Sequence, residues 1–334
     1  MTSATYLVTG GTGFVGSRIL LQLLEQGFKV KTSVRSLSKE DQLRKSLVLS
    51  SEKGLTKATV DANLSLFVAN LTSDDGWEEN FKDVTYVLHV ASPFPAVIPK
   101  DPQELIKPAV EGTLRVLKWA KATPTVKRVV ITSSFAAVGY GQSPTRTEPF
   151  TENDWTDING VDRPYIHSKV LAERAAWNFI DNEKPHFDLA VLNPAYIFGP
   201  TLKEGTADST SIALIANLLN GSLKEVPSMY ISLIDIRDVA KLHIDAATNP
   251  KAGGQRFVLT TGESTPYLQL ANILRENLPA DKTSKIPTKE VESPKDYFKP
   301  VSSQKAEETF NWTPIPTKEV LLASAKSIFE EQGL

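Results

Sequence analysis

The chain has no cysteine and only four histidines among its 334 residues. Without cysteine, disulfides and thiolate-bound metal centres are excluded, and the composition fits a reducing compartment. The histidines do not form an HExxH-like pair, so the sequence predicts no histidine-based metal site. They are His89, His167, His186 and His243.

An excess of charge of one sign is also missing, since the formal net charge is −2. This balance gives no reason to expect nucleic acid or an anionic membrane as a partner. No apolar run approaches the roughly 20 residues that span a bilayer, and no basic segment followed by an apolar one opens the chain. We therefore expect a cytoplasmic protein without a membrane partner.

What the sequence does contain is a repeated alternation of short apolar strands and helical patterns. Residues 5–9 read as a buried strand, a glycine-rich turn follows, and apolar residues at helical spacing lead to Gly27. Strand, turn, helix and strand in this order open a parallel sheet. The fold class predicted is α/β, a Rossmann-type doubly wound parallel sheet. Its further strands are expected at 29–34, 66–69, 86–90, 129–132 and 189–192.

The pattern changes after about residue 195. We expect a first unit over residues 1–194 and a smaller mixed α/β lobe over 195–334, with residues 235–250 returning to the first unit. Periodicity predicts helices in this half, one strand, and a surface loop over 281–300 that is rich in Lys and Pro. The helices are expected at 212–219, 237–247, 267–278 and 318–329, and the strand at 256–259.

The turn at residues 9–16 reads TGGTGFVG, with glycines at 10, 13 and 16. Glycine permits a positive φ and lets the backbone approach a pyrophosphate closely. The helix that follows presents free N–H groups and a positive dipole end to phosphates. A plain tight turn is the alternative, but the flanking strand and helix favour a dinucleotide site.

The end of the second strand predicts which dinucleotide is bound. An NAD site often has an acidic residue there for the ribose 2′-hydroxyl, whereas this chain has Arg35, with Lys39 close behind. A guanidinium suits a 2′-phosphate. We therefore predict NADPH/NADP+ as the cofactor, against the alternative of a solvated basic loop.

A tyrosine and a lysine stand four residues apart, at Tyr165 and Lys169. Positions i and i+4 share one face of a helix, and Pro164 suits a helix start. Because an ammonium favours phenolate, we expect Lys169 to lower the phenol pKa, which is about 10 in free tyrosine. Spacing alone is equally consistent with a surface Tyr and Lys on an amphipathic helix.

The strand at 129–132 runs into two serines, Ser133 and Ser134. Ligands of doubly wound sheets bind at the carboxyl ends of strands, where a hydroxyl can donate to a carbonyl oxygen as it gains charge. Hydroxyl residues at strand ends also serve as caps and turns.

Together these motifs resemble the extended short-chain dehydrogenase/reductases. Residues 89–94 (HVASPF), 165–177, Asn193-Pro194 with 198–200, and 235–240 (DIRDVA) are similar to the dihydroflavonol 4-reductase-like branch. That branch includes plant flavonoid and cinnamoyl reductases and fungal NADPH-dependent aldehyde and ketone reductases of the methylglyoxal type. The similarity covers nearly the whole chain, and the fungal reductases are the nearer likeness.

The resemblance implies roles for particular residues. Ser134, the last of the hydroxyl run, would be the catalytic serine with Ser133 as the second choice, Tyr165 the proton donor, and Lys169 the residue that binds the nicotinamide ribose and lowers the phenol pKa. The other cofactor-binding positions implied are Gly10, Thr12, Gly13, Phe14, Val15, Gly16, Arg35, Lys39, Asn70, Leu71, Ala91, Ser92, Pro194, Ala195 and Ile197.

The chain departs from the family pattern at two places. Asn70-Leu71 stands where many relatives have Asp-Leu beside the adenine, and an amide can make the same contact. Ala109 stands where many extended members have asparagine, so a proton relay through an asparagine at that position is in doubt. Phe94, Phe135, Tyr196 and Met229 are candidates for an apolar substrate pocket, although each is equally consistent with ordinary core packing.

The function implied is NADPH-dependent reduction of a small ketone or aldehyde to an alcohol, with residues 1–194 binding NADP and the second lobe binding substrate. Three alternatives stay open. A nucleotide-sugar epimerase or dehydratase would hold NAD tightly, which Arg35 disfavours. A non-catalytic NADP sensor keeps the fold without the chemistry, and a steroid dehydrogenase is the third. The sequence does not indicate the oligomeric state.

Overall fold

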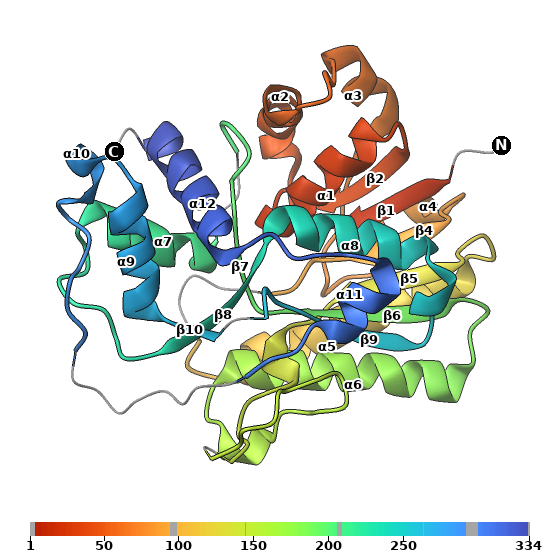
Figure 1. Ribbon diagram of the computed structural model, residues 1–334. Helices are drawn as coiled ribbons and strands as arrows, with labels where there is room; N and C mark the ends of the chain where they lie inside the picture. Colours follow the sequence, from red (N-terminus) through yellow and green to blue (C-terminus); the bar gives the residue numbers. More distant parts are fainter. Residues whose placement is uncertain are drawn as a thin grey trace.

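The computed structural model describes residues 4–93, 99–143, 145–205, 209–262, 264–291 and 300–332. Its centre is a seven-stranded sheet in the order β3-β2-β1-β4-β5-β6-β9, and every neighbouring pair is parallel (Figure 1). The predicted Rossmann-type α/β fold is therefore confirmed. The strands are β1 (Thr5–Thr9), β2 (Lys29–Val34), β3 (Leu64–Val68), β4 (Tyr86–His89), β5 (Arg128–Thr132), β6 (Asp188–Pro194) and β9 (Gln255–Leu259).

Side chains alternate between the two faces of this sheet, and each face is covered by helices (Figure 1). Tyr6 and Val8 pack in one cluster while Leu7, between them, packs in the other, as the period of two in a strand requires. The first cluster includes side chains of α1 (Phe14–Glu25), α2 (Glu40–Ser50), α3 (Lys57–Asn63), α8 (Ile236–Thr248) and α11 (Gln304–Phe310), and the second those of α4 (Glu78–Phe81), α5 (Gln103–Ala122) and α6 (Pro164–Glu183).

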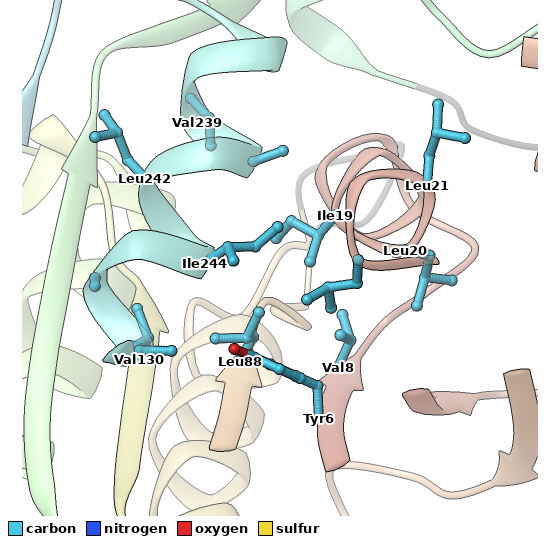
Figure 2. Close-up of a cluster of buried hydrophobic side chains, with 14 of the residues drawn as sticks. Tyr6, Val8, Ile19, Leu20, Leu21, Leu88, Val130, Val239, Leu242 and Ile244 are labelled. Atoms are coloured by element: carbon cyan, nitrogen blue, oxygen red, sulfur yellow. The ribbon is translucent and has the colours of Figure 1, made fainter. Parts of the chain in front are cut away.

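Figure 2 shows how the first cluster joins distant parts of the chain. Ile19 of α1 and Ile244 of α8 meet over the sheet residues Val8, Leu88 and Val130. Burying such side chains stabilises each by about 1.5–3 kcal/mol. Helix α8 is thereby held on the large sheet, although more than 200 residues separate it from α1.

A second, smaller layer lies beside the large sheet (Figure 1). Its sheet has the order β10-β8-β7, with β8 parallel to β7 and antiparallel to β10. Its apolar cluster also includes Phe14 at the start of α1, so the glycine turn adjoins this lobe. The elements are β7 (Tyr196–Phe198), β8 (Tyr230–Asp235), β10 (Ser264–Pro266), α7 (Thr210–Asn220), α9 (Tyr267–Asn277), α10 (Ala280–Thr283) and α12 (Thr317–Gln332). Single 3₁₀ turns are η1 (Leu37–Lys39), η2 (Phe135–Ala137), η3 (Ile158–Gly160) and η4 (Pro250–Ala252).

The expected surface loop over 281–300 is wrong for its first part. Helix α10 ends at Thr283, Ile286 is 4% exposed within the cluster of the small lobe, and Glu290 forms a β-bridge with Val226. The abundance of Lys and Pro suggested an exposed segment, and one buried residue, Ile286, produces no apolar periodicity that could indicate otherwise. Residues 292–299 lie outside the described residues.

The strand expected at 256–259 exists, but it extends the large sheet beside β6. Helix α11 also packs in the cluster on that sheet. The division at residue 194 stays a prediction. Besides residues 235–250, β9 and α11 also return from the second half of the chain to the large sheet. Within the described ranges, no helix has the length and apolar character needed to cross a membrane.

Candidate active site

The carboxyl ends of seven parallel strands meet at one edge of the large sheet. In the register of the strands, Thr9 lies opposite His89, and Thr132 lies opposite Leu192. The segments that follow β1, β2, β4, β5 and β6 therefore start side by side. This topology brings together the glycine turn, Arg35, Ala91, Ser134 and the segment at 194–197, which are far apart in the sequence.

The glycine turn has the close backbone contacts that the sequence predicts. Gly10 has a φ of +75°, and the Gly13 amide donates to the Gly10 carbonyl at 3.0 Å. A Cβ at Gly16 would lie 2.2 Å from the Gly10 oxygen. The N-cap of α1 is Gly13, which has no side chain to accept from the first amides of the helix. These amides are thus available to phosphate oxygens.

A buried threonine–histidine pair fixes the loop opposite this turn. The Thr9 hydroxyl accepts from the amides of Val90 and Ala91, at 3.0 and 2.9 Å, so its own proton points to Nδ1 of His89, 2.9 Å away. Burial, with the nearby Lys169 cation, lowers the pKa of His89 to about 3. The neutral ring orients the Thr9 hydroxyl, and this hydroxyl holds residues 90–91 against Gly10. A Cβ added at Gly10 would lie 3.2 Å from Ala91.

Two cofactor candidates lie exposed at the ends of β2 and β3. Arg35 is exposed directly after β2, where Ser36 caps the 3₁₀ turn that ends at Lys39. Asn70 is exposed after β3, and its side-chain oxygen accepts from the amide and hydroxyl of Thr72. Because the Asn70 oxygen serves its own turn, the amide nitrogen is the group suited to adenine. Leu71 packs closely on Gly112 of α5.

The structure separates the two serines at the end of β5. Ser133 donates to Oε2 of Glu173 at 2.6 Å, in a buried contact. The Ser134 hydroxyl hydrogen-bonds with the Tyr165 side chain and also accepts from the Ala136 amide at 3.1 Å. Ser133 directly follows β5, and the backbone of Ser134 is extended. In such a segment successive side chains point to opposite sides. Ser134, and not Ser133, therefore faces the tyrosine.

Lys169 is buried one helical turn beyond Tyr165. Its Nζ donates to the Thr132 carbonyl at 3.3 Å and lies 5.9 Å from the centre of the Tyr165 ring. Burial lowers the pKa of Lys169 to about 8, and the Glu173 carboxylate opposes that shift. At neutral pH the side chain is therefore mainly an ammonium.

The pKa of Tyr165 is raised in this structure, so the expectation of a net lowering through Lys169 is wrong. Burial is the largest influence and raises the pKa of Tyr165, while the hydrogen bond with Ser134 opposes the rise and the neighbouring Tyr196 adds to it. The physical reason is that desolvation penalises phenolate. At neutral pH the phenol is consequently protonated, which is the state that a proton donor needs.

The substrate-pocket candidates differ in their surroundings. Tyr196 of β7 lies near both Tyr165 and Tyr267. Phe135 is 7% exposed and packs against Phe150 and Tyr140, with ring centres 5.9 Å apart in each pair. Packing accounts for Phe135, and its place in a pocket stays a prediction. Phe94 lies outside the described residues.

The remaining candidates lie where β6 passes into the small lobe. Pro194 ends β6, and the Ala195 amide donates to the Leu259 carbonyl at 3.0 Å. Ile197 and Val15 each pack against the clusters of both layers. Met229 packs against the cluster of the small lobe.

Sequence reasoning missed a buried polar network behind the site. The side chains of Asn193 and Arg256 both donate hydrogen bonds to the Glu173 carboxylate. Two signals were present: Glu173 follows Lys169 at the i+4 position, and Arg256 is a charge within an apolar strand. In the part of the chain that the structure describes, no three acidic or histidine side chains gather as metal ligands would.

Residues 6–260 match the NAD dependent epimerase/dehydratase family. The chain belongs to that family. It is also 36% identical over 294 residues to the putative NADPH-dependent methylglyoxal reductase GRP2 of Candida albicans, covering 83% of this chain and 84% of that one. The ketoreductase azaE of Aspergillus niger is 35% identical over 271 residues, or 77% of each chain.

A solved structure shares nearly the whole fold. The NADPH complex of the yeast methylglyoxal/isovaleraldehyde reductase Gre2 superposes with a TM-score of 0.84 at 27% identity, covering 98% of this chain and 99% of that one. The resemblance to extended short-chain dehydrogenase/reductases, with fungal reductases among the relatives, is confirmed. The chain is a member of an oxidoreductase group whose related structure holds NADPH.

Proposed function

We propose that this protein reduces a small aldehyde or ketone to the alcohol with NADPH. The observation that carries the proposal is the pairing of Ser134 with Tyr165 at the carboxyl edge of the sheet, one helical turn from the Lys169 ammonium. The names of the related methylglyoxal and ketone reductases support the same reaction class.

The residues around the glycine turn fit the cofactor. Glycines 10, 13 and 16 would let the turn bring the first amides of α1 to the pyrophosphate, and the Gly16–Gly10 contact leaves no room for a side chain. Arg35, with Lys39, would bind the 2′-phosphate, and Asn70 the adenine. Lys169 would bind the nicotinamide ribose, beside the segment at 194–197. When bound, NADPH supplies the hydride.

The protein's own residues then manage the carbonyl oxygen. The Ser134 hydroxyl donates to this oxygen as the hydride reaches the carbonyl carbon and negative charge develops. Tyr165 donates its phenolic proton to the oxygen, which completes the alcohol and leaves a phenolate that solvent reprotonates. The charge of Lys169 stabilises that phenolate at the moment it forms. Each donor is expected to contribute about 10²-fold or more.

NADPH consumption tests the proposal. Purified protein is assayed by nicotinamide absorbance with methylglyoxal, isovaleraldehyde and a set of β-keto esters and aryl ketones. We expect turnover with NADPH that Tyr165→Phe abolishes while NADPH binding persists. Full activity of Tyr165→Phe would remove the phenol from the mechanism, and binding of NADPH without turnover would favour the sensor.

The family name keeps an epimerase or dehydratase as the second candidate. Such an enzyme would purify with NAD held tightly, and the absorbance and release of the dinucleotide on denaturation detect it. Protein that purifies free of NAD and turns over NADPH excludes this candidate. A cytoplasmic location and the use of the small lobe for substrate binding complete the proposal.

A further inference from the structure

Glu173 is a carboxylate buried behind the site, with 1% of its surface exposed. Its oxygens accept four hydrogen bonds. Ser133 and Asn193 donate to Oε2 at 2.6 and 2.8 Å, while Arg256 and Trp177 donate to Oε1 at 2.5 and 3.3 Å. A buried carboxylate is stable only when charge and hydrogen bonds compensate its desolvation, and this set of donors does so.

Three of the four donors come from the large sheet, and the fourth, Trp177, lies on α6 with Glu173. Ser133 follows β5, Asn193 belongs to β6, and Arg256 belongs to β9. The amide of Asn193 also donates to the Ser134 carbonyl at 3.2 Å. The backbone at Ser134 is therefore held on both sides, by the hydroxyl of Ser133 and by the amide of Asn193, and both bonds lead to Glu173.

Glu173 lies on helix α6, one turn beyond Lys169 and two turns beyond Tyr165. Its hydrogen bonds therefore fix the distance between the helix that carries the phenol and the strand end that carries Ser134. Proton transfer and carbonyl polarisation require these two hydroxyls to meet one oxygen atom, and a misplacement of about 1 Å can cost about 10²-fold in rate.

We propose that Glu173 is a positioning residue of the reaction: through Ser133 and Asn193 it sets Ser134 opposite Tyr165, and it places a negative charge one turn from Lys169. The inference rests on the proposed carbonyl reduction. Arg256 completes the arrangement, because its guanidinium pairs with Glu173, stacks 3.8 Å from the Trp155 ring, and donates to the carbonyls of Glu152 and Asp154.

The variant Ser133→Ala tests the positioning. Ser303→Ala is the control, because Ser303 is also buried and donates to a carboxylate, Glu307, at the same 2.6 Å, with the Thr260 carbonyl as a further acceptor at 3.0 Å. We expect Ser133→Ala to lower kcat with methylglyoxal or isovaleraldehyde about tenfold, with the Kd for NADPH unchanged within about twofold. Ser303→Ala should keep the wild-type kcat while losing a similar amount of thermal stability.

A second variant, Glu173→Gln, tests the charge through the pH profile of kcat. The groups around Lys169 are His89 of β4, the Thr132 carbonyl of β5 with His243 of α8 behind it, and Tyr165 and Glu173 of α6. Both imidazoles are neutral at pH 7. Removing the carboxylate leaves Arg256 unneutralised, so the alkaline limb of kcat should move to lower pH.

The outcomes separate this inference from the proposed function. Absence of NADPH turnover by the wild-type protein with all of these carbonyl compounds would refute the function itself, whereas turnover that Tyr165→Phe leaves intact would remove the phenol from the mechanism. If Tyr165→Phe is inactive but Ser133→Ala has the kcat of Ser303→Ala, the positioning role is refuted. It is also refuted if Ser133→Ala is more damaging than Ser134→Ala, because Ser133 would then be the polarising serine. Should Glu173→Gln not fold, the serine comparison alone decides.

Discussion

The substitution Gly16→Ala tests the dinucleotide site most directly. Alanine is favoured over glycine inside a helix by about 1 kcal/mol, so without a steric effect the change would stabilise α1. In this fold the new Cβ would lie 2.2 Å from the Gly10 carbonyl oxygen. At Gly13 the corresponding distance is 3.3 Å, a tight contact that a much smaller shift of the Gly10 carbonyl would relieve. The turn and the helix must therefore separate by about 1 Å. A misplacement of this size can lower the rate of a reaction about 10²-fold, and we expect a similar loss of NADPH affinity.

A hundredfold loss of NADPH affinity corresponds to about 2.8 kcal/mol. At a ligand concentration of about 1,000 times the wild-type Kd, NADPH stabilises the native protein by about 4 kcal/mol, and the variant would keep only about 1.4 kcal/mol of this. Fluorescence titration measures the Kd, and denaturation with and without NADPH measures the stabilisation. The two measurements should agree, because both report the same change in binding.

Gly27→Ala is the control for this experiment. Gly27 has a φ of +79°, but an added Cβ would meet no atom within 4 Å. Alanine there strains the backbone by about 1–2 kcal/mol without touching the turn, so stability should fall while the Kd for NADPH stays the same. Wild-type affinity in Gly16→Ala would refute the reasoning that this contact shapes the phosphate site.

Three further predictions follow from charge and burial. The kcat of the wild-type protein should decline above about pH 8, as the Lys169 ammonium is lost, and Lys169→Arg should remove that limb even if its rate is lower; an unchanged limb would assign it elsewhere. Burial lowers the pKa of His243 to about 4, below its unfolded value of about 6.5. The unfolded chain then binds the proton more tightly, so stability should fall as pH drops below 6.5, by roughly 3 kcal/mol at pH 4, and denaturation of His243→Gln should show a smaller loss. Arg35→Ala should raise the KM for NADPH by ~10-fold or more and leave that for NADH nearly unchanged; equal effects on both would contradict a 2′-phosphate contact.

Much of the fold was predictable because its signals are local. Strand β2 has the predicted bounds of 29–34, and Gly27 follows α1 with the positive φ of a helix end. Helix α6 begins at Pro164, so Tyr165 and Lys169 share it as the spacing predicts. The exceptions have no local signal. The residues of β9 do not show which sheet the strand joins, and Ile286 is a single buried residue in a polar segment.

The candidate site divides in the same way. The glycine turn, the i+4 pair and the basic residue after β2 are recognisable within a few residues, and the sequence by itself determined them together with the alternating α/β pattern. The choice between Ser133 and Ser134 depends on Glu173 and Asn193, which lie 40 and 60 residues beyond Ser133. The sign of the Tyr165 pKa shift depends on burial by other elements. Only the tertiary structure decided these points, because hydrogen-bond partners and desolvation come from packed neighbours that no local spacing records.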